Sequence, residues 1–275
     1  MSFDSLYALH YDRFSGADYA SYAAFFTEAA RRFADVALRE ALDLGCGAGG
    51  LSAVLAGAGL DMVGLDVSPE MLSVARAKPE NRDVLLLCQD MRELELYGTV
   101  QGAVSAYDCL NYLGSLSELS DVLALLHNYI EPGGVFVFDV NTPARYERVY
   151  ADNCFCFEDD GALLVWRNEY APKSRRNRME LTLFARRADG GEAQHDLRKI
   201  VLRADRQELH EGQHLEDRQQ PQGACGGDGV TRPAAPLGLP QLLFMVCGEE
   251  VQLDAADGDG VPGLQARGGE DVLAV

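Results

Sequence analysis

Short apolar runs alternate with amphipathic runs between residues 41 and 142. The runs are EALDL, GGLSAVLAGAG, DMVGLDV, SPEMLSVARA, VLLLCQD, VQGAVSAYD, LSDVLALLHNYI and VFVFDVN. The apolar runs have the length of buried strands, and the amphipathic runs have the spacing of surface helices. This order predicts β-α-β units, in which parallel strands form one sheet with helices on both faces.

The pattern differs on both sides of this core. Residues 11–33 are rich in aromatic residues and predict one or two helices. Residues 155–172 and 177–191 look like antiparallel strands joined by the polar tip KSRRNR, which we interpret as a solvated turn. We expect these strands to fold over a substrate pocket.

The last 75 residues have a different composition, with no Ser, Asn, Ile, Lys, Tyr or Trp, and with 13 acidic against 5 basic residues. Apart from QLLFMVCGEEVQL, little there could build a core. The missing Lys, Asn, Ile and Tyr have A/T-rich codons, so we favour a GC-rich gene read out of frame after about Val201. The alternative is an acidic low-complexity tail. Either way, we expect the sheet to keep an exposed edge.

The chain has 275 residues and a formal net charge of −19. That charge disfavours nucleic acid and anionic membranes as partners. No apolar run is long enough to span a membrane, and the N-terminus lacks a signal-peptide pattern, so we expect a cytoplasmic protein. The seven cysteines are scattered without a C-x-x-C pair, which favours reduced thiols over disulfides or a metal site.

The stretch ALDLGCGAGG raises the central question about the ligand. Gly45, Gly47 and Gly50 fit the dinucleotide pattern G-x-G-x-x-G, which indicates a nicotinamide or flavin cofactor. The same stretch fits an acid-led pattern that starts at Asp43 and runs through Gly45, Gly47 and Gly49, which indicates S-adenosylmethionine. Both ligands need a backbone that turns tightly and approaches them closely.

Three acidic residues each follow a predicted strand, and they bear on this choice. Asp66 lies 21 residues after Gly45 and could accept hydrogen bonds from ribose hydroxyl groups in either kind of site. Asp43 would repel a pyrophosphate, but not the ammonium and sulfonium of S-adenosylmethionine. Asp90 could accept a hydrogen bond from an adenine amino group. The three acids together favour a cationic adenosyl ligand.

LDLGCGAGG, GLDVSPEML and CQDM resemble successive motifs of class I S-adenosylmethionine-dependent methyltransferases. YDCLNYL, FVFDVNTPARY and YDRFSGADYASYAAFF are similar to a narrower group of small uncharacterised bacterial members. The likeness covers roughly residues 7–187. It implies a Rossmann-like, doubly wound and mostly parallel sheet, with an antiparallel β insertion after the fifth strand. We do not expect the C-terminal strands of that fold to form. The domains would be N-terminal helices (1–36), the cofactor-binding core (37–150), the antiparallel lid region (151–203) and the atypical tail (204–275).

The resemblance also implies roles for single residues on the cofactor side. The methionine part of the cofactor would be lined by Asp43, Gly45, Cys46 and Gly47. The ribose would be held by Asp66 and Val67, and the adenine would be framed by Met71, Asp90 and Met91. Tyr11 would close over the cofactor from the N-terminal helix.

On the substrate side, the resemblance implies that Asp108 faces the acceptor, with Asn111 and Tyr112 nearby. Methyl transfer is an in-line displacement, so orientation is the main requirement. A base is needed only if the nucleophile must lose a proton early, and Asp108 is the best-placed candidate. We expect a small-molecule acceptor. The alternatives are a nicotinamide-dependent oxidoreductase and a non-catalytic S-adenosylmethionine-binding protein.

HEGQH at residues 210–214 matches the H-E-x-x-H pattern of zinc proteases. That pattern requires a helix that aims both histidines at one metal ion. Here the flanking residues are polar and a glycine lies inside the motif, so we expect no metal site.

Overall fold

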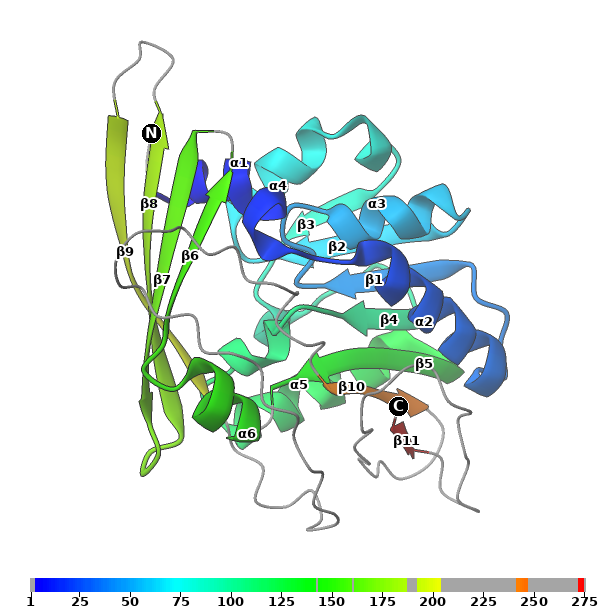
Figure 1. Ribbon diagram of the computed structural model, residues 1–275. Coiled ribbons are helices and arrows are strands. Elements are labelled where there is room, and N and C mark those ends of the chain that lie inside the picture. Colours follow the sequence, from blue (N-terminus) through cyan, green and yellow to red (C-terminus); the bar gives the residue numbers. More distant parts are fainter. Residues whose placement is uncertain are drawn as a thin grey trace.

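The computed structural model describes residues 3–141, 143–159, 161–186, 192–203, 241–246 and 272–274. Within these residues the strands form two sheets (Figure 1). The strands of the first sheet are β1 (Glu40–Leu44), β2 (Asp61–Asp66), β3 (Leu85–Cys88), β4 (Val100–Ser105), β5 (Ile130–Val140), β10 (Gln241–Val246) and β11 (Val272–Ala274). The strands of the second sheet are β6 (Cys154–Asp159), β7 (Ala162–Ala171), β8 (Arg176–Arg186) and β9 (Glu192–Arg203).

Helices precede, connect and follow the strands of the first sheet. The α-helices are α1 (Phe3–Ser15), α2 (Tyr19–Phe33), α3 (Gly50–Gly57), α4 (Pro69–Ala77), α5 (Leu116–Tyr129) and α6 (Pro143–Arg145). Shorter helical turns are η1 (Pro79–Asn81), η2 (Met91–Glu93), η3 (Cys109–Tyr112) and η4 (Tyr146–Tyr150). None of the helices in the described part of the chain is long and apolar enough to cross a membrane.

The strand order in the first sheet is β11-β10-β5-β4-β1-β2-β3. The strands β1 to β5 pair in parallel with one another, as the β-α-β pattern predicted. The chain winds outward from β1 to β3, then returns to pair β4 with the other side of β1. The order therefore reverses between β1 and β4, and in such sheets ligands bind at the carboxyl ends of the strands near this reversal.

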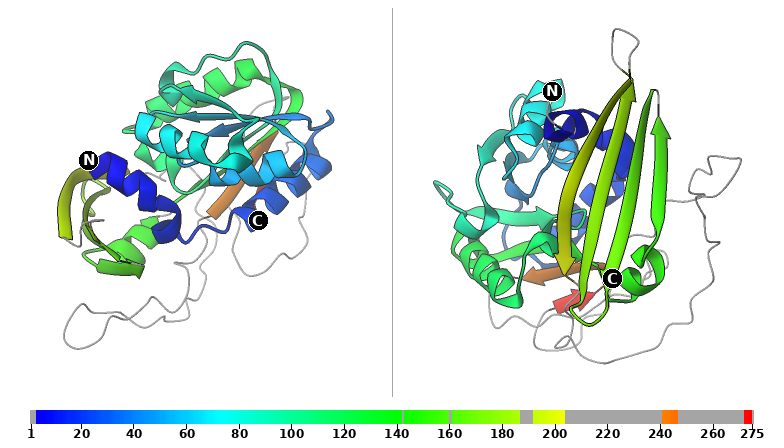
Figure 2. Two further views of the ribbon diagram at one scale, coloured as in Figure 1. Left: turned by 90° about the horizontal axis from the view of Figure 1, so that it is seen from above. Right: turned by 90° about the vertical axis from the view of Figure 1, so that its left-hand side faces the viewer.

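Helices cover both faces of this sheet (Figure 2). On one face, buried residues of α2, α3 and α4 form a cluster with Val135 and Val137 of β5. On the other face, α5 packs in a second cluster with Phe136 and Phe138 of the same strand. Alternate side chains of a strand point to opposite faces, which explains why the run VFVF belongs to both clusters.

The helices α2, α4 and α5 begin at residues whose side chains satisfy one of the first backbone N–H groups. The Ser68 hydroxyl accepts a hydrogen bond from the Met71 N–H at 3.2 Å, and Pro69 occupies the first turn. This confirms the cap that the sequence SPEM predicted. Asp18 caps α2 in the same way by accepting the Ser21 N–H at 3.0 Å.

The second sheet is antiparallel, in the order β6-β7-β8-β9. It stands beyond the carboxyl ends of β1 and β4, with α1 on the side facing the first sheet (Figures 1 and 2). Phe14 of α1 is buried against a cluster that includes Leu164, Leu181 and Leu183. The second sheet and α1 therefore enclose the edge where a ligand would bind.

The C-terminal part differs from the expectation of an exposed sheet edge. β10 pairs antiparallel with β5 from Gln241↔Val140 to Val246↔Val135, and β11 pairs antiparallel with β10. β10 falls in QLLFMV, the apolar part of the one run after Val201 that could join a core. Residues 204–240 and 247–271 lie outside the described residues, and the out-of-frame hypothesis stays a prediction for them.

Hydrogen exchange of the purified protein tests the pairing of β10. Backbone groups paired in a sheet exchange slowly, so we expect peptides covering residues 241–246 to exchange at least about a hundredfold more slowly than an unfolded chain. Peptides from β5 in the same digest serve as the control. Exchange of residues 241–246 at the unfolded rate, with β5 protected, would support the out-of-frame hypothesis instead.

Candidate functional site

The glycine loop joins β1 to α3 beside the strand-order reversal. Gly45, Gly47 and Gly49 have φ angles of +82°, +52° and +73°. A residue with a Cβ atom is strained in this region. At Gly45, a Cβ would also lie 1.8 Å from the Cys109 sulfur. Because Cys109 follows β4, the loops after β1 and β4 touch each other, and only glycine permits that contact.

Asp66, the last residue of β2, joins the glycine loop to the second strand. One carboxylate oxygen accepts the Gly47 N–H at 2.8 Å, and the other accepts the Ser68 N–H at 2.8 Å. Burial raises the pKa of the Asp66 carboxyl, and these hydrogen bonds oppose that rise. A carboxylate can accept about four hydrogen bonds. Asp66 therefore keeps lone pairs with which it could bind ribose hydroxyl groups.

Asp43 is buried inside the turn, with 2% of its surface exposed. Its carboxyl accepts the Ser52 hydroxyl at 2.6 Å and so attaches α3 to β1. Burial raises the pKa of Asp43 to about 7. Its negative charge is then only partial near neutral pH, so it repels a pyrophosphate less than the sequence argument assumed.

Cys46 follows Gly45 and is also buried. Its N–H donates to the Leu65 carbonyl at 2.9 Å, beside the bond from the Gly45 N–H to the same oxygen at 2.7 Å. Burial strongly raises the pKa of the Cys46 thiol, which keeps it protonated. Cys46 therefore contributes its backbone and its size to the loop rather than a nucleophile.

The residues expected around an adenine lie at the carboxyl ends of β2 and β3. Val67 is 65% exposed, and Met71 and Met91 are partly buried. Asp90 accepts the Arg92 backbone N–H and the Arg92 Nε, each at 2.9 Å, and its bond from the Arg92 side chain lowers the pKa of Asp90. An adenine amino group would have to share Asp90 with this guanidinium, which the sequence argument did not foresee.

Tyr11 lies above the glycine loop. A Cβ placed on Gly47 would be 3.8 Å from the Tyr11 ring, which is ordinary van der Waals distance. The Tyr7 and Tyr11 rings pack edge to face with their centroids 5.8 Å apart. Tyr11 is thus in position to cover a ligand on Gly47, and this role stays a prediction.

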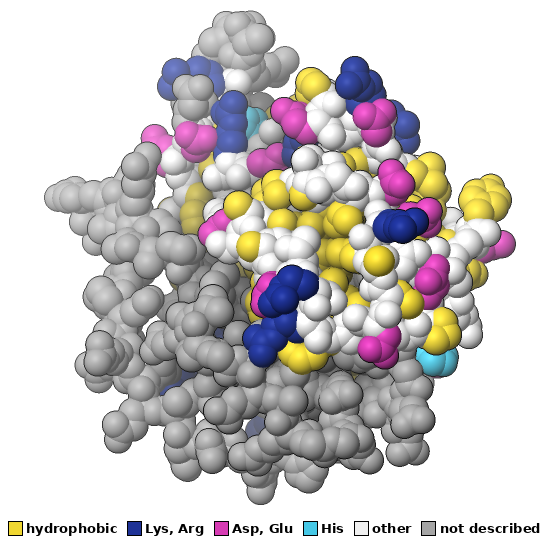
Figure 3. Space-filling view, turned by 90° about the vertical axis from the view of Figure 1, so that its right-hand side faces the viewer, with side chains coloured by type: hydrophobic (Ala, Val, Ile, Leu, Met, Phe, Trp, Pro, Cys, Tyr) yellow, Lys and Arg dark blue, Asp and Glu magenta, His cyan; other side chains and the backbone are white. Residues whose placement is uncertain are grey.

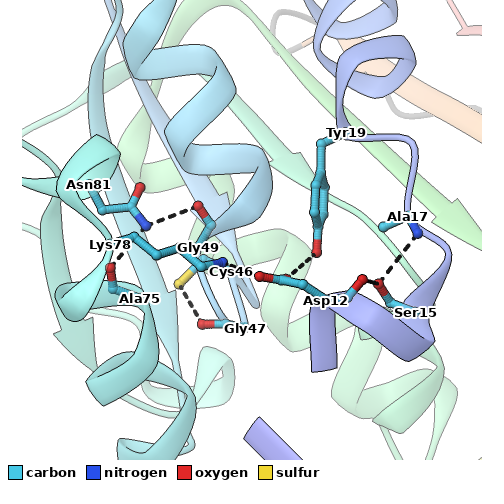
Figure 4. Close-up of polar contacts among 10 residues, drawn as sticks. All are labelled: Asp12, Ser15, Ala17, Tyr19, Cys46, Gly47, Gly49, Ala75, Lys78 and Asn81. Atoms are coloured by element: carbon cyan, nitrogen blue, oxygen red, sulfur yellow. Dashed lines mark hydrogen bonds and ion pairs between the residues drawn. The ribbon is translucent and has the colours of Figure 1, made fainter. Parts of the chain in front are cut away.

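An ion pair attaches α1 to the end of α4 (Figure 4). The Lys78 side chain runs past Gly49 toward Asp12, with which it forms the ion pair, and Asp12 also accepts the Tyr19 hydroxyl at 3.1 Å. Asn81 anchors the loop from the other side by donating to the Gly49 carbonyl at 3.1 Å. The helix that carries Tyr11 is therefore held over the glycine loop by polar contacts.

Asp108 lies after β4, across the strand-order reversal from the glycine loop. It has a φ of +67° and directly follows Tyr107, which has a φ of +59°. One of its carboxylate oxygens, Oδ2, accepts the Tyr150 hydroxyl at 3.5 Å. The other, Oδ1, is buried and has no partner within 3.5 Å among the described residues, although the Asn141 side chain lies near enough to lower the pKa of Asp108. Burial raises the pKa of Asp108, and the charge of Arg145 opposes that rise.

The other two residues expected near the acceptor lie in η3, the turn that directly follows Asp108. Asn111 is buried, and its side-chain oxygen accepts the Asn141 N–H at 3.2 Å, which ties η3 to the end of β5. Tyr112 is 51% exposed. Asn111 therefore has a structural contact that the sequence did not indicate.

Comparisons with known proteins agree with this geometry. The model of a family described as "Methyltransferase domain" matches residues 41–134. The protein GWCH70_2453 of Geobacillus sp. (strain WCH70), whose name as a methyltransferase is provisional, is 29% identical over 71% of this chain and 80% of its own length. An S-adenosylmethionine-dependent methyltransferase from Clostridium acetobutylicum ATCC 824 has a crystal structure that superposes with a TM-score of 0.62 at 26% identity, covering 70% of this chain and 77% of that one.

The chain contains a class I S-adenosylmethionine-dependent methyltransferase domain. S-adenosylmethionine is the methyl donor, and the nicotinamide alternative is set aside. A further relative, the ubiquinone biosynthesis O-methyltransferase of Pseudomonas aeruginosa (strain UCBPP-PA14), is 29% identical over 41% of this chain and 50% of its own length. The chain thus spans only half of that relative.

The loop of this methyltransferase fits its cofactor chemically. Gly47 presents no side chain toward Tyr11, Asp66 offers acceptor lone pairs, and Asp108 follows β4, the strand that pairs with β1. The described residues contain no group of three His, Cys, Asp or Glu that could hold a metal ion, and HEGQH lies outside them.

Sequence reasoning missed two features of the methyltransferase site. One is the Lys78–Asp12 ion pair, which joins residues far apart in the sequence. The other is Asp139, which lies fully buried at the end of β5. Its signal was present, because an acidic residue ends the otherwise apolar run VFVFDV.

Replacement Asp66→Ala tests the proposed ribose site. We expect S-adenosylhomocysteine binding, measured by calorimetry, to weaken by about 2–4 kcal/mol, because the carboxylate that would accept both ribose hydroxyl groups is lost. Asp61→Ala at the other end of β2 is the matched control and should bind normally. Unchanged affinity in Asp66→Ala would place the ribose elsewhere, and tighter binding of NAD than of S-adenosylhomocysteine would contradict the cofactor assignment.

Replacement Lys78→Met tests whether the ion pair with Asp12 holds α1 over the site. Partly exposed ion pairs contribute about 0.2–1 kcal/mol, so we expect the dissociation constant of S-adenosylhomocysteine to rise about 1.4- to fivefold. Arg82→Met removes the exposed contact with Asp83 and should have no effect. Equal affinities in the two variants would show that the ion pair does not stabilise the position of α1 over the glycine loop.

Proposed function

We propose that this methyltransferase acts on a small-molecule acceptor that binds at the carboxyl ends of β4 and β5, beside Asp108. One observation carries the proposal. Asp108 lies directly across the strand-order reversal from the glycine loop, with a carboxylate oxygen that has no hydrogen-bond partner among the described residues. Such an oxygen is suited to accept a hydrogen bond from the methyl-accepting group.

The residues of the site would act mainly by orientation. S-adenosylmethionine supplies a methyl group on a sulfonium that is already a good leaving group. Asp66 and the glycine loop would hold the adenosyl end, and Tyr11 would exclude water above it. Asp108 Oδ1 would hold the acceptor and take its proton. Because burial raises the pKa of Asp108, this carboxylate is a stronger base than an exposed aspartate.

Charge and the relatives support a small molecule as acceptor. The net charge is −19, and on the face shown in Figure 3 the described acidic and basic side chains are interspersed rather than gathered into a basic stripe. The Pseudomonas relative is named for ubiquinone biosynthesis, which supports a small-molecule acceptor here as well.

The aromatic residues expected over the substrate pack mainly on one another. The Trp166 ring lies 5.4 Å from Tyr150 and 5.5 Å from Phe155, and Tyr170 stacks on Tyr146 at 5.8 Å. These contacts attach the second sheet to η4. We therefore base the proposed position of the acceptor on the unpaired oxygen of Asp108 and not on an aromatic surface.

Labelled methyl transfer into a whole-cell extract, which is afterwards separated into small-molecule, nucleic-acid and protein fractions, tests the proposed function. With S-adenosylmethionine labelled in its methyl group, we expect label in the small-molecule fraction. In Asp108→Asn the transfer rate should fall about a hundredfold or more, because the base is lost, with the affinity for S-adenosylhomocysteine unchanged.

Three other results would contradict the proposal. Label found only in the nucleic-acid or protein fraction would overturn the acceptor class. A normal rate in Asp108→Asn would remove Asp108 from the mechanism. Tight cofactor binding without transfer into any fraction would favour the non-catalytic alternative.

A further inference from the structure

Asp139 is a completely buried carboxyl group that the proposed methyl transfer does not use. It lies one residue before the end of β5, on the face covered by α2, and none of its surface is exposed. Both of its oxygens accept hydrogen bonds from the loop after β4. The Tyr107 N–H donates to Oδ2 at 2.6 Å, and the Asp108 N–H donates to Oδ1 at 2.8 Å.

The loop that Asp139 binds has an unusual backbone. Tyr107 and Asp108 are consecutive left-handed residues, with φ angles of +59° and +67°, and neither is glycine. Such residues persist only where their surroundings hold them. Successive backbone N–H groups in unusual conformations can form a concave site for an anion. The Asp139 carboxylate occupies such a site and compensates for the strain.

A third donor comes from the N-terminal part of the chain. The Tyr22 hydroxyl of α2 donates to Asp139 Oδ2. The Tyr22 ring also packs on the Tyr107 ring, with the centroids 4.7 Å apart. The Asp108 loop is therefore fixed between β5 and α2. Burial and the nearby charge of Asp108 raise the pKa of Asp139 to about 7, and the three hydrogen-bond donors oppose that rise.

We propose that Asp139, with Tyr22, is the positioning residue that holds Tyr107 and Asp108 in the left-handed conformation and so directs the Asp108 carboxylate toward the methyl acceptor. This inference rests on the proposed role of Asp108. It assigns no contact between Asp139 and the substrate or the cofactor. Its effect should therefore appear in the transfer rate and in the loop conformation, and not in cofactor affinity.

The first test is Asp139→Asn, which replaces one acceptor oxygen with an NH₂ group facing a backbone N–H. We expect labelled methyl transfer into the small-molecule fraction to fall at least about tenfold, with S-adenosylhomocysteine affinity within about twofold of normal. Tyr22→Phe removes one donor and leaves both backbone bonds, so its loss should be smaller. A crystal structure of Asp139→Asn should show Tyr107 or Asp108 with a negative φ.

The decisive test is rescue at Tyr107 in the Asp139→Asn background. Tyr107→Gly and Tyr107→Ala both remove the ring, but only glycine adopts a positive φ without strain. We expect the glycine double variant to transfer methyl groups about tenfold faster than the alanine double variant, in line with the penalty of a left-handed Cβ residue. In the wild-type background, where Asp139 holds the loop, the two replacements should differ much less.

The outcomes separate this inference from the proposed function. A normal rate in Asp108→Asn would defeat the proposed role of Asp108 itself. A reduced rate in Asp108→Asn together with a normal rate in Asp139→Asn would overturn only the positioning role. The positioning role would also be overturned if the glycine and alanine double variants were equally slow, because Asp139 would then serve stability alone.

Discussion

The hydrogen bonds from the Gly47 and Ser68 N–H groups to the Asp66 carboxylate are the constraint on which the site depends. They connect the turn after β1 to the turn after β2, so the two loops cannot move independently. This connection requires left-handed glycines, because the chain must reverse within a few residues for the Gly47 N–H to reach the Asp66 carboxylate. Ser52 and Asn81 then fix the α3 end of the loop through Asp43 and Gly49.

A carboxylate also binds the backbone N–H groups of a loop on the other side of the strand-order reversal. Asp139 accepts two successive backbone N–H groups from the neighbouring strand end, as Asp66 accepts N–H groups from two neighbouring turns. In both places a carboxylate fixes the shape of a loop that contains left-handed residues. The two loops meet where Gly45 lies against Cys109, so the cofactor side and the acceptor side of the methyltransferase lie next to each other.

Local sequence patterns predicted the features that depend on neighbours in the chain. The parallel sheet, the glycine loop, the Ser68 cap and the position of Asp66 all follow from short motifs. Features that depend on distant partners were missed. Tyr22 and Asp139 are 117 residues apart, and the left-handed Tyr107 and Asp108 carry no glycine that would signal them. The contact between Asp90 and Arg92 was not foreseen either, because it depends on the shape of η2.

A crystal structure of the protein with S-adenosylhomocysteine is the most direct test of the central claim, that carboxylates at the strand ends shape one connected cofactor and acceptor site. The account predicts ribose oxygens within hydrogen-bond distance of Asp66 while the Gly47 and Ser68 bonds remain, with the Tyr11 ring over the ligand. A ribose bound away from Asp66, or a glycine loop that binds the ligand only after the bond between Gly47 and Asp66 has broken, would contradict it.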